Sequence, residues 1–313
     1  MTNGSSAARQ DLRRRRGLSK LEQGYMGFIL ILPWLIGFCI FKLYPFVSSL
    51  VYSFTDYDLF KGVQNVVGFQ NYIDAFTKPK NVKALQVTFT YAFMTVPLKL
   101  IFALFIAYIL NFKIKGWVCS ERRTMCLPFW AARWPSRLLW KALFKNDGVI
   151  NTILAMLGFE SINFLADKNW ALFIICLLRV WQFGSAMVLF LAALKGVPED
   201  LYEAASIDGA TKGRQFLSIT IPLISPVIFY NLVTQLVQAF QEFNGPYIIT
   251  NGGPRNATTL ISVIVYNTAF KDYKVGMSSA MAWVMFVIVM VLTVIAFVSQ
   301  KKWVYYSDDD GRG

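Results

Sequence analysis

The chain contains no histidine, which removes the commonest general base and the commonest metal ligand from its chemistry. Its four cysteines form no C-x-x-C pair, and Cys39 and Cys176 lie inside apolar runs, where cysteine behaves as a small buried apolar residue. The G-x-x-x-x-G-K-[ST] phosphate loop is also missing, so the chain cannot hydrolyse ATP through that motif. We therefore predict no catalytic residue, no metal site and no cofactor bound by this chain.

Charged residues are scarce as well, at 16% of the sequence against 56% hydrophobic residues. A soluble domain is about a quarter charged, and the apolar excess here falls in long runs, which indicates that lipid is the solvent. The net charge of +13 would fit nucleic-acid binding. The cations cluster at the ends of apolar runs, however, as the arginines at 13–16 do, and this placement is typical of membrane orientation signals. We predict no nucleic-acid partner.

Five segments supply the roughly 20 apolar residues that a membrane helix requires. They are 26–54, 87–110, 171–194, 216–243 and 275–298. A sixth segment, 124–144, is weaker because it contains Pro135 and three cations, namely Arg133, Arg137 and Lys141. We include it because it brings the N-terminus and the loop around Glu203 to the same side. The sequence thus predicts an all-α membrane protein with about six transmembrane helices and cytoplasmic N- and C-termini.

The distribution of cations favours the same topology, because the predicted cytoplasmic segments hold more lysine and arginine than the predicted outer loops. We divide the chain into a basic cytoplasmic segment, 1–25, a transmembrane domain, 26–300, and a cytoplasmic tail, 301–313. The largest predicted outer loop covers only 55–86, so we expect no separate soluble domain.

The loop between the spans 171–194 and 216–243 has the composition of a short helix. Pro198 suits its first turn, Glu199 and Asp200 complement the positive end of the helix dipole, and Gly209 is a natural stop. The alanines at 204 and 205 leave a surface that another protein can approach closely. On propensity alone, a well-capped surface helix with no further role explains the loop at least as well.

The spacing in this loop resembles the signature loop of ABC importer membrane subunits. It reads Glu203-Ala204-Ala205, three residues, Gly209, nine residues and Ile219-x-x-Pro222, with Asp208 and Ala210 also in their usual places. The segments 145–151, 181–184, 191–194 and 250–254 are similar to the carbohydrate-uptake branch of that family. The resemblance covers about 24–303 and is strongest to maltose-type or glycerol-phosphate-type permease subunits of binding-protein-dependent transport systems, which have the type I ABC importer permease fold.

This resemblance implies that the chain forms half of the translocation pathway of an importer in the bacterial cytoplasmic (inner) membrane. The loop 196–216 would contain the coupling helix, which docks on an ATPase subunit through Glu203, Ala204, Ala205, Asp208, Gly209 and Ala210. The implied partners are a second homologous permease subunit, two cytosolic ATPase subunits that bind ATP and Mg, and an extracytoplasmic substrate-binding protein. Closure of the ATPase dimer would rock the two permease subunits between inward-open and outward-open states.

Polar side chains inside membrane spans are costly and tend to face a cavity or a partner. The span 216–243 carries four at spacings of 4, 3 and 4, hence on one helical face: Asn231, Gln235, Gln238 and Glu242. The span 171–194 offers three more at spacings of three: Arg179, Gln182 and Ser185. We interpret both sets, with aromatic residues nearby, as the lining of a pathway for a sugar or oligosaccharide. Hydrogen bonds that hold two membrane subunits together are the alternative.

Arg179 makes an acidic sugar a candidate substrate, since a cation inside a span attracts an anion such as a uronate or a sugar phosphate. It could instead pair with an acid, or extend its stem to the outer surface. The stretch 129–137 departs from the small apolar residues typical of the family, and we predict no function for its arginines.

Two other classes of function are weighed against the importer. A self-sufficient secondary transporter or channel would need inverted repeats and broken helices of its own, and it leaves the Glu203 loop unexplained. A membrane enzyme would need a catalytic set, which a chain without histidine and with few acids in its spans does not offer.

Overall fold

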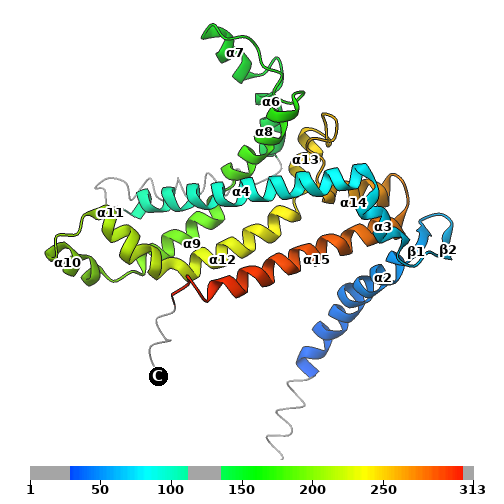
Figure 1. Cartoon of the computed structure of the whole chain (residues 1–313), viewed down its shortest axis with the longest axis horizontal. Helices are drawn as coiled ribbons and strands as arrows, with labels where there is room; N and C mark the ends of the chain where they lie inside the picture. Colours follow the sequence, from blue (N-terminus) through cyan, green and yellow to red (C-terminus); the bar gives the residue numbers. More distant parts are fainter. Residues whose placement is uncertain (1–28, 112–134, 306–313) are drawn as a thin grey trace, which may run out of the picture.

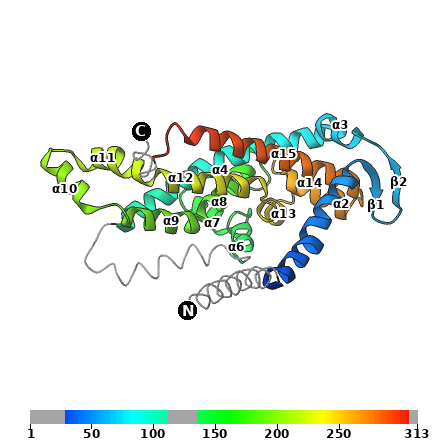
Figure 2. The same ribbon diagram turned by 90° about the horizontal axis from the view of Figure 1, so that it is seen from below.

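The computed structural model describes residues 29–111 and 135–305 and is almost entirely helical (Figure 1). Its long helices lie side by side in an elongated bundle. Helix α10 (Glu199–Ile207) and helix α11 (Lys212–Gln215) project from one end of the bundle. The hairpin of strands β1 (Thr55–Asp58) and β2 (Gly62–Val66) lies at the opposite end, in Figure 1 and in Figure 2. The two loop regions therefore lie on opposite sides of the membrane-crossing body.

Within the described ranges, four helices are long and apolar enough to cross a membrane: Ile29–Ser53, Pro79–Asn111, Lys212–Ile249 and Val275–Gln300. A fifth crossing is formed by α8 (Lys168–Trp181) and α9 (Gly184–Lys195), which are bent by 42° at the break between them. These five crossings coincide with the five strong apolar segments of the sequence. The prediction of a mostly helical membrane protein is therefore confirmed.

The sixth predicted span is described only in part. Helix α6 (Pro135–Leu143) covers nine residues of it, which is too short to cross a bilayer alone. The remainder, 124–134, lies outside the described residues, as do the predicted basic segment 1–25 and the end of the tail, 306–313. The described ranges thus hold up to five crossings, and a count of six stays a prediction.

The crossings contain the following elements. The first crossing contains the π-helix η1 (Cys39–Leu43) and α2 (Tyr44–Ser53), and the second is α4 (Pro79–Asn111). The crossing after α10 is built from α11, the π-helix η2 (Phe216–Thr220), α12 (Ile221–Phe240) and α13 (Asn244–Ile249). The last is α15 (Val275–Gln300), which follows α14 (Ile261–Phe270), and the short helices α3 (Gln70–Thr77) and α7 (Val149–Met156) lie in connections.

A small β-hairpin accompanies the helices. Strand β1 (Thr55–Asp58) pairs antiparallel with β2 (Gly62–Val66) directly after the first crossing. The side-chain amide of Asn71 donates to the carbonyl oxygens of Ser53 and Thr55, at 2.9 and 3.0 Å. The backbone of α15 at Gly276 lies so close to β1 that a Cβ there would be 2.9 Å from the Tyr57 nitrogen and closer still to the Thr55 oxygen. The hairpin is thereby fixed to α3 and to the last crossing, α15.

The core lies where α4 packs against α8, α9 and α12. Buried residues of α4 recur every three or four positions along one face, and several of them are small: Ala84, Ala92, Ala103 and Ala107. Small residues let helix backbones approach closely, which matters where surrounding lipid offers no hydrophobic drive for association. Lys99 lies on the same face, so its charge is placed inside the bundle.

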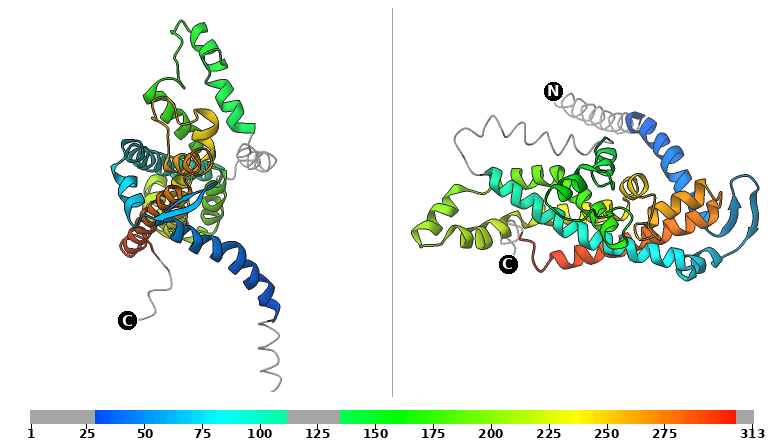
Figure 3. Two further views of the ribbon diagram at one scale, coloured as in Figure 1. Left: turned by 90° about the vertical axis from the view of Figure 1, so that its right-hand side faces the viewer. Right: turned by 90° about the horizontal axis from the view of Figure 1, so that it is seen from above.

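The first crossing behaves differently from the others. It diverges from the bundle (Figure 3), and none of the most apolar window of Ile29–Ser53 is buried. Its contact with the bundle comes from its last turns, where the ring of Phe46 lies 4.7 Å from that of Trp283 on α15. Most of its apolar side chains are therefore available to lipid or to another subunit.

The start of α12 is adapted to two prolines. Pro226 has no N–H, so the carbonyl of Pro222 loses its usual helical donor. The Ser225 hydroxyl donates to that carbonyl at 2.6 Å and accepts a hydrogen bond from the Tyr305 backbone N–H at 2.9 Å. The segment that follows α15 is thus tied to the beginning of α12, at the same end of the molecule as α10 (Figure 1).

Candidate functional site

Two regions carry the residues singled out by the sequence, and the first is α10. Pro198 is its N-cap, Glu199 and Asp200 are in its first turn, and it ends at Asp208. Gly209 has a φ of +76°, a conformation that favours glycine. The Gly209 N–H donates to the Ser206 carbonyl at 3.1 Å, and the Ala210 N–H donates to the Ala205 carbonyl at 2.9 Å. These two bonds form a Schellman motif, so the predicted helix with its glycine stop is confirmed.

The surface of α10 is open. The helix, which is described over its whole length, has no buried residue. Glu203, Ala204 and Asp208 are exposed, and Ile207 retains 87% of its maximal exposure. A short helix with exposed apolar and small residues gains little from packing within its own chain. This surface is suited to contact with another protein.

Four side chains outside the predicted docking residues hold α10 in place. The hydroxyls of Tyr202 and Thr220 share a hydrogen bond of 2.7 Å, which joins α10 to the π-helix η2 before α12. The Gln215 amide donates to the Ser206 hydroxyl at 2.9 Å and to the Ala210 carbonyl at 3.1 Å. Sequence patterns could mark Tyr202 as the one aromatic residue of α10, but they could not reveal its partner.

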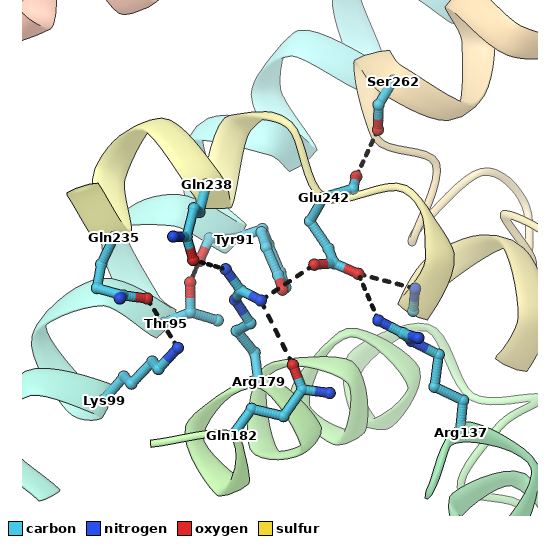
Figure 4. A network of polar contacts seen from close by, with 11 residues as sticks. Tyr91, Thr95, Lys99, Arg137, Arg179, Gln182, Gln235, Gln238, Glu242 and Ser262 are labelled. Carbon is cyan, nitrogen blue, oxygen red and sulfur yellow. Dashed lines mark hydrogen bonds and ion pairs between the residues drawn. The ribbon is translucent and has the colours of Figure 1, made fainter. Parts of the chain in front are cut away.

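The second region is a charged cluster at the centre of Figure 4, built by α4, α6, α8 and α12. Arg179, near the end of α8, donates to the side-chain oxygens of Gln238 at 3.0 Å and Gln182 at 3.4 Å. Its guanidinium also lies 3.3 Å from the Glu242 carboxylate. Of the three roles open to Arg179, the structure thus shows pairing with an acid inside the bundle.

Glu242 is shared between two cations. The guanidinium of Arg137, on α6, lies 3.9 Å from one carboxylate oxygen, and the backbone N–H of Gly245 donates to the same oxygen at 2.9 Å. The side chains of Arg137, Arg179 and Glu242 are 14%, 13% and 11% exposed, so all three charges are largely removed from water. No function was predicted for Arg137, because its segment departs from the family pattern.

Lys99 adds a third cation. It is 3% exposed, and its ammonium donates to the side-chain oxygen of Gln235 at 2.7 Å, a neutral partner (Figure 4). The sequence contained the signal, since Lys99 lies near the middle of the predicted span 87–110, and a charge at that depth is a functional-site hypothesis by default.

The remaining predicted pathway residues lie apart from the cluster. Asn231 is 1% exposed, and its side-chain amide donates to the Val227 carbonyl of its own helix at 3.1 Å. Its side-chain oxygen has no hydrogen-bond partner among the described residues. Ser185 is exposed in the first turn of α9, beyond the break after Gln182. The expectation of one continuous helix over 171–194 is wrong. Because the break lies between Gln182 and Ser185, Ser185 does not continue the helical repeat of Arg179 and Gln182.

The Lys99–Gln235 pair permits a test of the cluster's energetics. Replacing Gln235 with leucine leaves a buried ammonium without a partner, and we expect a loss of about 3 kcal/mol in unfolding free energy. The double variant Lys99→Met/Gln235→Leu removes both polar groups, and most of that loss should be recovered. Thermal denaturation of the purified protein in detergent measures both effects. A double variant no more stable than Gln235→Leu would contradict this account of the pair.

Comparison with known proteins adds an independent finding. Residues 72–303 match the model of the family described as "Binding-protein-dependent transport system inner membrane component". The chain is 41% identical to the "Probable ABC transporter permease protein YesP" of Bacillus subtilis, with 98% of this chain and 99% of that protein covered. It is 33% identical to the "Trehalose/maltose transport system permease protein MalF" of Thermococcus litoralis, with 88% and 94% covered.

A solved structure also matches the fold. It is described as a bacterial ABC transporter involved in the import of the acidic polysaccharide alginate, and its matching chain gives a TM-score of 0.80 at 23% identity. The match covers 92% of this chain and 99% of that one. At this identity, the likeness shows a shared fold.

Proposed function

We propose that this chain, which belongs to the family of binding-protein-dependent transport system inner membrane components, couples ATP hydrolysis by a partner to saccharide import through helix α10. Family membership makes the chain a multi-pass inner-membrane permease of an ABC importer, without ATPase activity of its own. The alternatives of a self-sufficient secondary transporter and of a membrane enzyme are set aside by this membership.

One observation carries the proposal about α10. The helix is rigidly capped and tied to the start of α12, yet its surface is free of contacts that would bury it. A rigid, exposed element fixed to a crossing can transmit movement from a docked partner into the bundle. We assign the docking surface to Glu203, Ala204, Ala205, Asp208, Gly209 and Ala210.

The proposed assembly contains further chains. This permease would pair with a second homologous subunit, and α10 would dock on one of two cytosolic ATPase subunits that bind ATP and Mg. The family description names a binding protein, which would deliver substrate at the opposite end of the bundle. The exposed first crossing supports the pairing, because most of its apolar surface is left uncovered by the described part of the chain.

The proposed substrate class is a sugar or oligosaccharide. The charged cluster supplies donors and acceptors for hydroxyl groups, and aromatic rings lie close to it. The rings of Trp140 on α6 and Trp181 on α8, the helices that carry Arg137 and Arg179, are 6.2 Å apart. The rings of Phe243 and Tyr247, just after Glu242 in the chain, are stacked at 4.8 Å. Sugar ring faces stack on such side chains. The name of the Thermococcus litoralis relative, a trehalose/maltose permease, supports the same class.

Glu203→Lys tests the docking surface. We expect saccharide-stimulated ATP hydrolysis by the reconstituted complex to fall at least about tenfold, because a reversed charge in a docking contact creates repulsion. The matched control is Glu160→Lys, which makes the same charge change at an exposed residue outside α10. Both variants should insert into the membrane in equal amounts. If saccharide stimulates ATP hydrolysis of the Glu203→Lys complex as strongly as that of the control, the docking role is contradicted.

A further inference from the structure

We propose that Arg137 and Arg179 bind the carboxylate of an acidic saccharide, and that Glu242 holds this carboxylate position until substrate displaces it. This inference rests on the proposed saccharide import and narrows its substrate class. It assigns Lys99 the role of an additional positive charge, which favours an anionic over a neutral saccharide.

The charge balance of the cluster is the first argument. Among the described residues, three cations converge here, Lys99, Arg137 and Arg179, and Glu242 is the one acid paired with any of them. The two arginines alone exceed the acid by one positive charge, and a protonated Lys99 raises the surplus to two. Unpaired charges removed from water are costly and are found where function requires them. An entering anion would reduce that surplus, and a neutral sugar would not.

The geometry of the ion pairs is the second argument. Charge-assisted hydrogen bonds of guanidinium to carboxylate are about 2.7–2.9 Å long. The Glu242 contacts are longer, 3.3 Å to Arg179 and 3.9 Å to Arg137. The Nε–H of Arg137 is buried and has no partner among the described residues. Donors thus remain for a second, better-placed carboxylate.

The position of the cluster is the third argument. Arg179 is near the end of α8, just before the 42° break, and Glu242 follows the end of α12. Breaks in membrane helices at mid-depth are where transporters commonly build substrate sites. Trp181, two residues after Arg179 on α8, has an exposed ring on which a sugar ring can stack. A planar carboxylate is the group that this site already accommodates, in Glu242.

The test uses the complete complex in lipid nanodiscs, without binding protein, and equilibrium dialysis of three labelled probes. They are digalacturonate, its dimethyl ester and glucose 6-phosphate. We expect the ester to bind at least about 30-fold more weakly than the acid, because it cannot form charged hydrogen bonds with the arginines. Arg179→Gln should reduce binding of the acid to the level of the ester.

The Glu242→Gln variant distinguishes the two roles of Glu242 by the direction in which the affinity for digalacturonate changes. If Glu242 competes with substrate, removing its charge should raise the affinity for digalacturonate about tenfold and leave the ester unchanged. If the cluster only holds the helices together, the same variant should weaken binding or leave it unchanged, and that result would overturn the proposal. Val188→Ala, an exposed change on α9, is the control for altered packing.

The remaining outcomes are also decisive. Equal binding of the acid and the ester, or no binding of either at millimolar concentration, overturns the proposal, and preferential binding of glucose 6-phosphate overturns the carboxylate assignment. If the complex assembles and a neutral saccharide stimulates its ATPase, only this inference fails. If the chain does not associate with an ATPase subunit, the proposed function itself fails.

Discussion

Replacing Gly209 with proline is expected to reduce transport at least about 100-fold while the protein still inserts into the membrane. Proline fixes φ near −65° and has no N–H, whereas Gly209 has a φ of +76° and donates to the Ser206 carbonyl. Losing both costs about 3 kcal/mol or more, which is roughly a 100-fold change in the population of the docking conformation. Uptake into proteoliposomes that contain the whole complex measures the loss.

The chain offers a matched control for this variant. Gly158 follows α7 with a φ of +82°, and the bonds from Gly158 to Ala155 and from Phe159 to Leu154 repeat the same capping motif. Gly158→Pro should destroy that cap and leave transport largely intact. Gly209→Asn should fall between wild type and proline, since asparagine tolerates the left-handed conformation. Equal losses from the two proline variants would show that any damaged helix cap lowers transport.

Gly276→Val is expected to have a large effect on stability. A side chain there would collide with the backbone of β1, at the Tyr57 nitrogen and the Thr55 oxygen, and neither atom can move without displacing the hairpin. Overpacking costs up to about 3 kcal/mol where side chains can adjust, and here the obstacle is main chain. We expect the loss in unfolding free energy to reach that upper value. Thermal denaturation in detergent measures it.

Gly37→Val is the control, since a Cβ at Gly37 meets no atom within 4 Å and the residue lies in the diverging first crossing. Its stability should be close to that of the wild type. A Gly276 variant as stable as the Gly37 variant would mean that the hairpin does not pack on α15 as closely as described.

The sequence predicted the crossings well, because about 20 consecutive apolar residues have few soluble alternatives. It also predicted α10, whose proline, acids and glycine each have a local reason for their position. The hairpin escaped prediction because β1 and β2 are only four and five residues long, and their position against Asn71 and Gly276 depends on contacts distant in the sequence. The break in 171–194 was missed because neither Gln182 nor Phe183 is a helix breaker.

The charged cluster was predicted in part. Helical spacing correctly grouped Gln235, Gln238 and Glu242, but a spacing rule covers one helix at a time. The contacts of Lys99 and Arg137 with that group cross between α4, α6 and α12 and depend on packing distances that no local pattern encodes. The same reasoning that marked Arg179 would have marked Lys99.

Helix α12 connects the region around α10 to the charged cluster around Glu242. It is one rod of 20 residues, about 30 Å long, which begins beside the Tyr202–Thr220 bond and ends just before Glu242. A tilt of about 10° around its midpoint moves each end by about 2.6 Å, given a half-length of about 15 Å. That displacement is comparable to the 3.3 Å separation of Arg179 and Glu242. If α10 transmits movement as proposed, a tilt of α12 by this amount would change the separation of Arg179 and Glu242 by a distance close to its present value.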